Sequence, residues 1–203
     1  MNKFEKNCIF QKRKCLSPMY CEELIKYFEM VSTDSIGSSG GLYNHNRRKK
    51  NSIDISTNIF DDNSPIIETL RTKLFESLRE MCKRKPFTYL NDQPKWACYK
   101  DFNIQKYNPG GGFYETHCEH SPTSEDGDGM YSNRILSWMF YLNDVTDKGG
   151  THFPIQNITL KARQGDLYIW PAGWTHMHCG VPSPTQTKYI ATGWANFEYR
   201  KTV

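Results

Sequence analysis

Long hydrophobic runs are missing from this sequence of 203 residues. No stretch approaches the roughly 20 apolar residues that a membrane-spanning helix needs, and the N-terminal stretch MNKFEKNCIFQKRKC lacks the apolar centre of a signal peptide. A strong excess of one charge is missing too, because 26 basic residues face 22 acidic ones and leave a formal charge of +4. Nucleic-acid binding normally shows as a concentrated basic face. We therefore expect a cytoplasmic protein without membrane or nucleic-acid partners.

The cysteines form no recognisable framework. There are seven, an odd number, at positions 8, 15, 21, 82, 98, 118 and 179, and no two are spaced as C-x-x-C. Neither a disulfide network nor a zinc ribbon is therefore indicated. We expect reduced thiols.

The apolar content is sufficient for one core. Hydrophobic residues make up 37% and aromatic residues 14% of the chain, which is typical of a globular protein. Its length fits one domain better than two. We predict a single domain over residues 1–203, with a helical and loop-rich N-terminal support at 1–95 and a β-structured core at 96–199.

Two amphipathic helices are expected in the first half. Residues 21–31 and 64–85 carry apolar residues at spacings of three and four, and Ser64 can cap the second helix, whose first turn contains Pro65. Between them, a Gly- and Ser-rich stretch with a basic run at 36–50 predicts a loop. It leads into a strand that carries Ile53 and Ile55.

From Trp96 onward, short apolar or alternating segments are separated by Gly, Pro, Asp and Asn. They predict strands near residues 96–107, 112–120, 134–143, 151–154, 157–162, 165–170, 174–179 and 187–199. Many short strands favour a jelly roll. Because the helices precede the strands, the expected class is mainly β (α+β): a cupin-like double-stranded β-helix with the helices on one outer face.

One short motif has the composition of a metal site. His117 and Glu119 stand two apart, which on a strand would point both side chains to one face. Two histidines and one carboxylate leave open positions on a first-row metal. Alone, H-x-E is a weak signal, and an acidic, solvated loop is the simpler interpretation. We expect residues 121–130 to be a solvent-facing loop in which Glu125, Asp126 and Asp128 are not ligands.

A second motif sharpens this signal. In HCGVPSPTQTKYIATGW, His178 is followed by Pro182 at +4 and Lys188 at +10, and Tyr107 stands ten residues before His117. With RILSWMFYLNDV and GGTHFP between them, residues 96 to 194 resemble the iron(II)- and 2-oxoglutarate-dependent dioxygenases of the prolyl 4-hydroxylase type. The motifs are most similar to those of compact microbial or virus-encoded members.

The resemblance implies that His117, Glu119 and His178 are the iron ligands. The family usually has Asp at the middle position, so the longer Glu119 is a departure that shifts the carboxylate. Strand parity does not distinguish His176 from His178, but only His178 has the family's offsets. We expect His176 to line the pocket mouth, and His120 and His152 to be hydrogen-bonded surface or strand histidines.

The resemblance also implies a site for the cosubstrate. Lys188 would bind the far carboxylate of 2-oxoglutarate, because a buried carboxylate requires a cation. Tyr141 would be a second donor, and Tyr107 would bond nearer the iron. Thr151 and Trp194 are either pocket walls or ordinary core.

The implied activity is hydroxylation of a C–H bond with Fe(II), 2-oxoglutarate and O2, with ascorbate as an additional reductant. The expected substrate is a prolyl residue in a peptide or protein. The same chemistry on a free amino acid, a small metabolite or a nucleobase is an alternative, and so is a non-enzymatic metal-binding jelly roll. The loop at 36–50 is either a lid over the substrate or a simple connection, and the oligomeric state stays open.

Overall fold

The computed structural model describes residues 1–34, 49–61, 63–93, 95–120 and 133–198. Most of the two loops expected at 36–50 and 121–130 lies outside these residues, including the acidic positions Glu125, Asp126 and Asp128. A lid formed by residues 36–50 therefore stays a prediction from the sequence.

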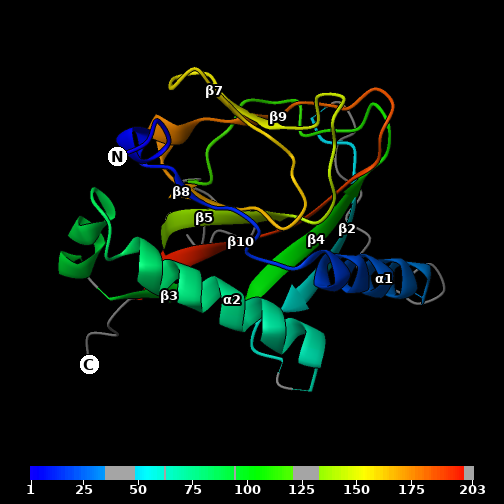
Figure 1. The fold of residues 1–203 in the computed structure, drawn as a ribbon, viewed down its shortest axis with the longest axis horizontal. Coiled ribbons are helices and arrows are strands. Elements are labelled where there is room, and N and C mark those ends of the chain that lie inside the picture. The colour runs from blue at the N-terminus through cyan, green and yellow to red at the C-terminus, as the bar shows by residue number, and fades with distance from the viewer. Residues whose placement is uncertain (35–48, 62, 94, 121–132, 199–203) are drawn as a thin grey trace.

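Two antiparallel sheets form the body of the molecule (Figure 1). The large sheet has the order β1-β8-β5-β10-β4-β2, with β3 also paired to β10, and the small sheet has the order β7-β6-β9. The strands are β1 Phe10–Lys12, β2 Ile53–Asn58, β3 Trp96–Cys98, β4 Asp101–Tyr107, β5 Arg134–Tyr141, β6 Thr151–Phe153, β7 Ile158–Leu160, β8 Leu167–Pro171, β9 Cys179–Gly180 and β10 Lys188–Phe197.

Two helices, α1 Pro18–Asp34 and α2 Pro65–Met81, lie on the face of the large sheet that points away from the small sheet (Figure 1). The expected class, mainly β with N-terminal helices on one outer face, is confirmed. Ser64 is the N-cap residue of α2, but its side chain makes no capping bond, and its carbonyl accepts the Glu68 amide at 3.0 Å. Pro65 at the first position needs no such partner because it has no N–H. Short 3-10 helices span Glu5–Asn7, Phe87–Asp92 and Trp174–His176.

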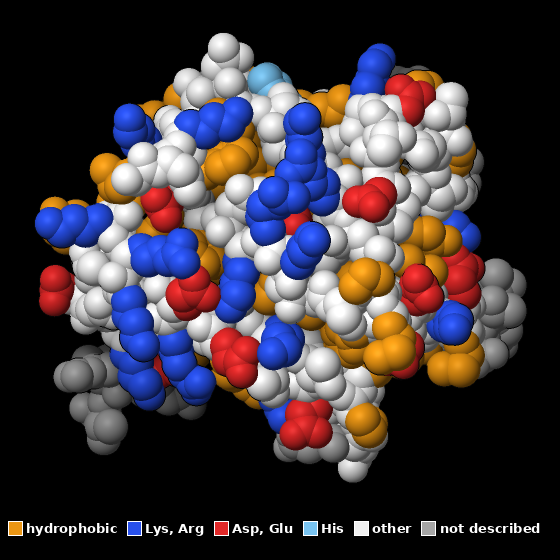
Figure 2. Space-filling view, viewed as in Figure 1, with side chains coloured by type: hydrophobic (Ala, Val, Ile, Leu, Met, Phe, Trp, Pro, Cys, Tyr) orange, Lys and Arg blue, Asp and Glu red, His pale blue; other side chains and the backbone are white. Residues whose placement is uncertain are grey.

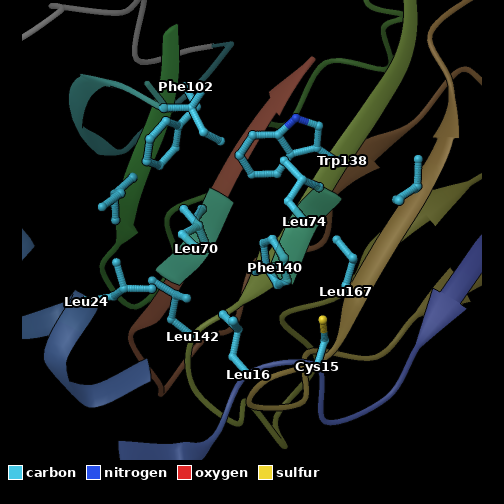
Figure 3. Close-up of a cluster of buried hydrophobic side chains, with 14 of the residues drawn as sticks. Cys15, Leu16, Leu24, Leu70, Leu74, Phe102, Trp138, Phe140, Leu142 and Leu167 are labelled. Atoms are coloured by element: carbon cyan, nitrogen blue, oxygen red, sulfur yellow. The ribbon is translucent and has the colours of Figure 1, made fainter. Parts of the chain in front are cut away.

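The larger core lies between the helices and the large sheet (Figure 3). Leu24 of α1 and Leu70 and Leu74 of α2 are fully buried against Phe102 and Phe140 of the sheet. Each such side chain contributes about 1.5–3 kcal/mol on burial. The spacing of three and four between apolar residues therefore gives each helix one apolar face, and this face packs on the sheet.

A second core fills the space between the two sheets. It contains Tyr107, Tyr141 and Ile190 from the large sheet, Phe153 from the small sheet, and Trp170. Because side chains alternate along a strand, the even-numbered residues of β10 face this second core, while Ala191 and Ala195 face the helices. Lys188 and Trp194 have the same parity as Ile190.

Two expected strands are wrong. Residues 112–120 form an extended segment with isolated bridges, Lys50 to Phe113 and His117 to His178. Residues 174–179 begin as a 3-10 helix and reach strand geometry only at Cys179. The alternation of polar and apolar residues led to the prediction of a strand in both segments. In the structure, neither segment forms a regular ladder of strand hydrogen bonds over its length. The short strand β1, which pairs with β8, was not foreseen.

The surface in the view of Figure 1 is mixed in sign, with basic and acidic side chains interspersed among separate hydrophobic patches (Figure 2). Some basic residues here are paired with glutamates of α2, as in Lys12 with Glu80 at 2.9 Å. No helix among the described residues is long and apolar enough to cross a bilayer. All seven cysteines are free thiols.

Gly193 of β10 generates a stability prediction. A Cβ at this position would lie 2.5 Å from Trp138 Cζ2 and 2.9 Å from Phe102 Cβ. We expect Gly193→Ala to lower the free energy of unfolding by about 1–3 kcal/mol, because an overpacked core must shift. The matched control is Gly173→Ala, whose Cβ would have its nearest neighbours at 3.7 Å. Urea denaturation measures both, and equal stability of the two variants would contradict this packing.

Candidate metal centre and cosubstrate pocket

Backbone pairing brings the three expected ligands together. The His117 amide donates to the His178 carbonyl at 2.9 Å, and the His178 amide donates back to the His117 carbonyl at 2.8 Å. Two residues on, the Glu119 amide donates to the Ala172 carbonyl at 2.9 Å. The segment from His117 to Glu119 is therefore fixed to the segment between β8 and β9 without being part of a regular strand.

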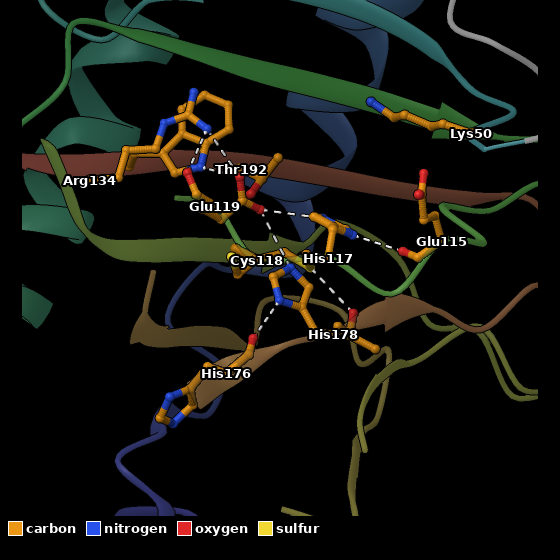
Figure 4. A network of polar contacts seen from close by, with 12 residues as sticks. Lys50, Glu115, His117, Cys118, Glu119, Arg134, His176, His178 and Thr192 are labelled. Atoms are coloured by element: carbon orange, nitrogen blue, oxygen red, sulfur yellow. Dashed lines mark hydrogen bonds and ion pairs between the residues drawn. The ribbon is translucent and has the colours of Figure 1, made fainter. Parts of the chain in front are cut away.

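The three side chains converge on one point (Figure 4). Glu119 Oε1 lies 3.5 Å from His117 Nε2 and 3.4 Å from His178 Nε2, and one ligand atom of each residue lies within 4.8 Å of the others. Metal–ligand bonds of about 2.0–2.2 Å fit between donors at this spacing. Two imidazoles and one carboxylate are the donor set of non-haem iron(II) sites with open positions.

Backbone carbonyls orient both imidazoles. His117 Nδ1 donates to the Glu115 carbonyl at 2.9 Å, and His178 Nδ1 donates to the His176 carbonyl at 2.9 Å. With the proton held on Nδ1, the lone pair of each Nε2 faces the other ligands, as metal coordination requires. Phe113 stacks on His117 with ring centroids 3.8 Å apart, and Phe153 stacks on His178 at 5.3 Å.

The second oxygen of Glu119 is held from the opposite side. Trp194 Nε1 donates to Glu119 Oε2 at 2.9 Å, and an Arg134 nitrogen lies 3.2 Å from the same oxygen. Arg134 also lies over the Trp194 ring at 3.7 Å. These contacts keep Oε1 aimed at the two histidines (Figure 4). Burial would raise the pKa of Glu119, but the two imidazoles of His117 and His178 beside it outweigh burial and hold that pKa well below its usual value.

The role of Trp194 is therefore more specific than a pocket wall. Arg134 was missed by sequence reasoning, since the first residue of β5 carries no motif that marks it as a partner of Glu119. The only available signal was physical, namely that a buried carboxylate requires donors on the side away from the metal.

The expectation for His176 is wrong. Its side chain is buried and points away from the triad (Figure 4), with Nε2 2.9 Å from the Asn7 carbonyl and Nδ1 3.0 Å from the Thr175 hydroxyl. The 3-10 turn at 174–176 rotates it away from the face that His178 shares. Burial lowers the pKa of His176. His176 therefore ties the N-terminal segment to the sheet, and its backbone carbonyl orients His178.

The other two histidines match their expectation. His120 bonds to the Arg134 carbonyl at the surface, and His152 of β6 bonds to the Thr159 hydroxyl at 3.0 Å.

Lys188 is buried, with 4% of its surface exposed. It is the first residue of β10 and pairs with Tyr107 of β4, and its ammonium lies 4.7 Å from the centre of the Tyr107 ring. Within the described parts of the chain no hydrogen bond or ion pair reaches this ammonium, and burial lowers the pKa of Lys188 to about 8. A buried cation without an anion is the chemistry expected of a carboxylate subsite.

Tyr107 and Tyr141 belong to the cluster of buried residues between the two sheets, and Thr151 contacts Tyr141 there. Tyr141, on the strand that flanks β10 from the other side, shares a hydrogen bond of 2.8 Å with the Thr151 hydroxyl, and both residues are buried. The Tyr107 hydroxyl donates to Gln105 Oε1 at 2.6 Å. Thr151 therefore positions Tyr141, in addition to forming part of the wall.

The triad generates a metal-binding prediction. Replacing His117, Glu119 or His178 by Ala should abolish stoichiometric iron(II) binding in anaerobic calorimetry, because each removes one of three ligands, while circular dichroism reports an intact fold. His176→Ala is the matched control and should retain binding, since only its backbone carbonyl contacts the site. Loss of the metal in His176→Ala together with retention in His178→Ala would reverse the assignment.

Comparison with known proteins agrees with this geometry. Residues 102–196 match the 2OG-Fe(II) oxygenase superfamily. The chain is 28% identical over 118 residues to prolyl 4-hydroxylase 13 of Arabidopsis thaliana, an alignment that covers 47% of this chain and 42% of that protein. It is 26% identical over 203 residues to a candidate prolyl 4-hydroxylase of Acanthamoeba polyphaga mimivirus, covering 95% of this chain and 74% of that protein. The chain thus spans less than half the length of the plant relative.

The fold also resembles that of a prolyl hydroxylase of known structure. It is similar to the crystal structure of the viral collagen prolyl hydroxylase of Paramecium bursaria Chlorella virus-1 in complex with 2OG, with a TM-score of 0.69 and 18% identity. That match covers 94% of this chain and 97% of the other. The match of residues 102–196 to the 2OG-Fe(II) oxygenase superfamily implies Fe(II) and 2-oxoglutarate as cofactors, and the donors of His117, Glu119 and His178 fit the metal.

Proposed function

We propose that this protein hydroxylates a prolyl residue of a peptide or protein, using Fe(II), 2-oxoglutarate and O2. The observation that carries the chemistry is the combination of a two-histidine, one-carboxylate set with the buried Lys188, which has no ionic partner among the residues that the structure describes. A non-enzymatic metal-binding module needs the first feature but has no use for the second.

The chain's own residues hold and orient the reactants. His117, Glu119 and His178 would hold the metal, and Arg134 and Trp194 keep Oε1 of the carboxylate directed toward the two histidines. Bound iron with 2-oxoglutarate supplies oxidative decarboxylation to succinate and carbon dioxide, coupled to insertion of one oxygen atom into a C–H bond. Ascorbate would be a reductant supplied from solution.

Lys188 pairs with the far carboxylate of the cosubstrate, and Tyr141, which shares a hydrogen bond with Thr151, is the second donor. Aromatic side chains flank the metal end, where Phe153 and Trp170 both lie against the His178 ring with centroids at 5.3 and 5.2 Å.

A prolyl substrate is supported by the names of the relatives and by one surface feature. Trp174 is 73% exposed and stands two residues after Ala172, whose carbonyl accepts the Glu119 amide. An exposed aromatic ring on this segment suits an extended proline-containing chain, which docks in the polyproline conformation on aromatic surfaces.

Lys188 generates a binding prediction. Lys188→Met should weaken 2-oxoglutarate binding at least about 30-fold, because a buried carboxylate loses its cation, while iron(II) binding is retained. Lys106→Met is the matched control: Lys106 precedes Tyr107, is paired with Glu29 at 2.8 Å and faces the opposite side of β4. Anaerobic calorimetry measures both ligands, and unchanged cosubstrate affinity in Lys188→Met would remove Lys188 from the site.

The same residue predicts a pH dependence. In the free protein the Lys188 pKa is lowered to about 8, and a bound carboxylate favours the ammonium and raises that pKa again. Above pH 8 binding must therefore take up a proton, so affinity for 2-oxoglutarate should fall by up to about tenfold per pH unit. Lys188→Met should lack this decline, and a decline that persists in the variant would assign it to another group.

The substrate prediction concerns Trp174. Proline-containing peptides should stimulate 2-oxoglutarate turnover above the uncoupled rate and gain one oxygen atom in mass spectrometry. Trp174→Ala should weaken this stimulation through the KM for peptide and leave the uncoupled rate unchanged. Turnover with a free amino acid, a small metabolite or an oligonucleotide instead of peptides would replace the prolyl substrate while leaving the reaction type in place.

A further inference from the structure

A chain of buried polar side chains runs beside the cosubstrate pocket. Lys50, Asp54, Gln105 and Tyr107 are all at most 6% exposed. Lys50 forms an ion pair with Asp54, Gln105 Nε2 donates to Asp54 Oδ2 at 3.1 Å, and the Tyr107 hydroxyl donates to Gln105 Oε1 at 2.6 Å. The Ser52 hydroxyl donates to the other Asp54 oxygen at 2.7 Å. Neither the metal centre nor the Lys188 subsite, as described above, accounts for these residues.

Asp54 fixes the direction of the hydrogen bonds that run from it through Gln105 to Tyr107. An ionised Asp54 can only accept hydrogen bonds, so the amide nitrogen of Gln105 must face it. The amide oxygen of Gln105 then faces Tyr107 and takes the phenolic proton. The Tyr107 oxygen is left with lone pairs, and no proton, for any other partner.

This series of hydrogen-bonded side chains ends at Tyr107, whose ring lies next to Lys188. Asp54 pairs with Gln105 across β2 and β4, and Tyr107, on the same face as Gln105, pairs with Lys188 across β4 and β10. The ammonium lies 4.7 Å from the centre of the Tyr107 ring, within the range in which a ring face attracts a cation. A phenol that donates its proton keeps its ring rich in electrons and therefore attractive to Lys188.

The other end of the chain contacts the support of a metal ligand. Lys50 forms a backbone bridge with Phe113, and its ammonium lies 5.7 Å from the Phe113 ring centre. Phe113 in turn stacks on His117. Replacing a buried ion pair by apolar residues is often neutral for stability, so stability alone does not explain why charges occupy these positions.

We propose that Asp54 and Gln105, neutralised and held by Lys50, are positioning residues for 2-oxoglutarate: they lock the Tyr107 ring under the Lys188 ammonium and thereby aim this cation into the pocket. This inference rests on the proposed role of Lys188. It gives Tyr107 a different part from the one the family resemblance implies, because the ring acts as a platform and the hydroxyl does not donate to the cosubstrate.

The test separates positioning from simple structural support. In Asp54→Leu the buried Lys50 loses its ion pair with Asp54, so the midpoint of thermal unfolding should fall. The double variant Lys50→Met with Asp54→Leu should recover it, because both charges of this ion pair are removed together. The double variant should nevertheless bind 2-oxoglutarate about tenfold more weakly in anaerobic calorimetry, as expected for a lost supporting shell, and bind iron(II) normally. Wild-type cosubstrate affinity in the recovered double variant would overturn the proposal.

Two further variants carry the test if the double variant does not fold. Gln105→Leu and Tyr107→Phe each break the chain at the phenol, so each should weaken 2-oxoglutarate binding by a similar factor, and combining them should add nothing further. Tyr107→Leu also removes the ring and should be weaker than either. A large loss in Tyr107→Phe with no loss in Gln105→Leu would instead assign the hydroxyl a direct bond to the cosubstrate and overturn the platform role.

These outcomes are distinct from failure of the proposed function. If Lys188→Met binds 2-oxoglutarate as the wild type does, the subsite itself is wrong. If Lys188→Met loses binding while the chain variants keep it, the subsite stands and only the positioning role fails.

Discussion

The compensation of the Glu119 carboxylate is the constraint on which the site depends. Its side chain is only 16% exposed, and a largely desolvated carboxylate is costly unless its oxygens have partners. Here Trp194 and Arg134 contact one oxygen, and the other faces two imidazoles. Both oxygens of the Glu119 carboxylate therefore have a positively charged or hydrogen-bonding partner when a cation lies among His117, Glu119 and His178. The extra methylene relative to the family's usual Asp does not prevent this arrangement, because Oε2 is anchored and Oε1 is presented.

Strand β10 joins this centre to the cosubstrate pocket. Its alternation places Lys188, Ile190 and Trp194 toward the second core and Ala191 and Ala195 toward the helices. Gly193 allows Trp138 to pack against the strand from the helical side, where a Cβ would collide. The helices thus stabilise the site indirectly. The core between the helices and the large sheet holds β10 in place, and β10 carries both Lys188 and Trp194.

Sequence reasoning succeeded where a side-chain pattern has a local physical meaning. The helical periodicity and the alternation of β4, β5 and β10 located those elements, and the spacing motifs named His178, which the fold brings to His117 and Glu119, and Lys188, which the fold buries. It failed where long-range pairing replaces local pattern. Residues 112–120 alternate like a strand yet make only isolated bridges, and a 3-10 turn moves His176 away from the pocket.

Arg134 and the Lys50–Asp54–Gln105 chain were invisible for a related reason. Hydrogen-bond partners of a buried group come from strands far apart in the chain, and a lone Arg, Lys or Gln in a polar-looking stretch has no spacing to mark it. Only the fold shows that Asp54 pairs with Gln105 across β2 and β4, and that Arg134, at the start of β5, reaches Glu119. The sequence can state that such partners must exist, but not which residues they are.

The distribution of charge links the two cofactors. Arg134 approaches Glu119 on one side, Lys50 pairs with Asp54, and Lys188 has no anionic partner within the described residues. A metal held by His117, Glu119 and His178 would add positive charge at Glu119, and under the proposed function 2-oxoglutarate would add negative charge at Lys188. Each ligand would then compensate charge around the other. Such coupling acts by the same factor in either order of binding, because coupling free energy is reciprocal.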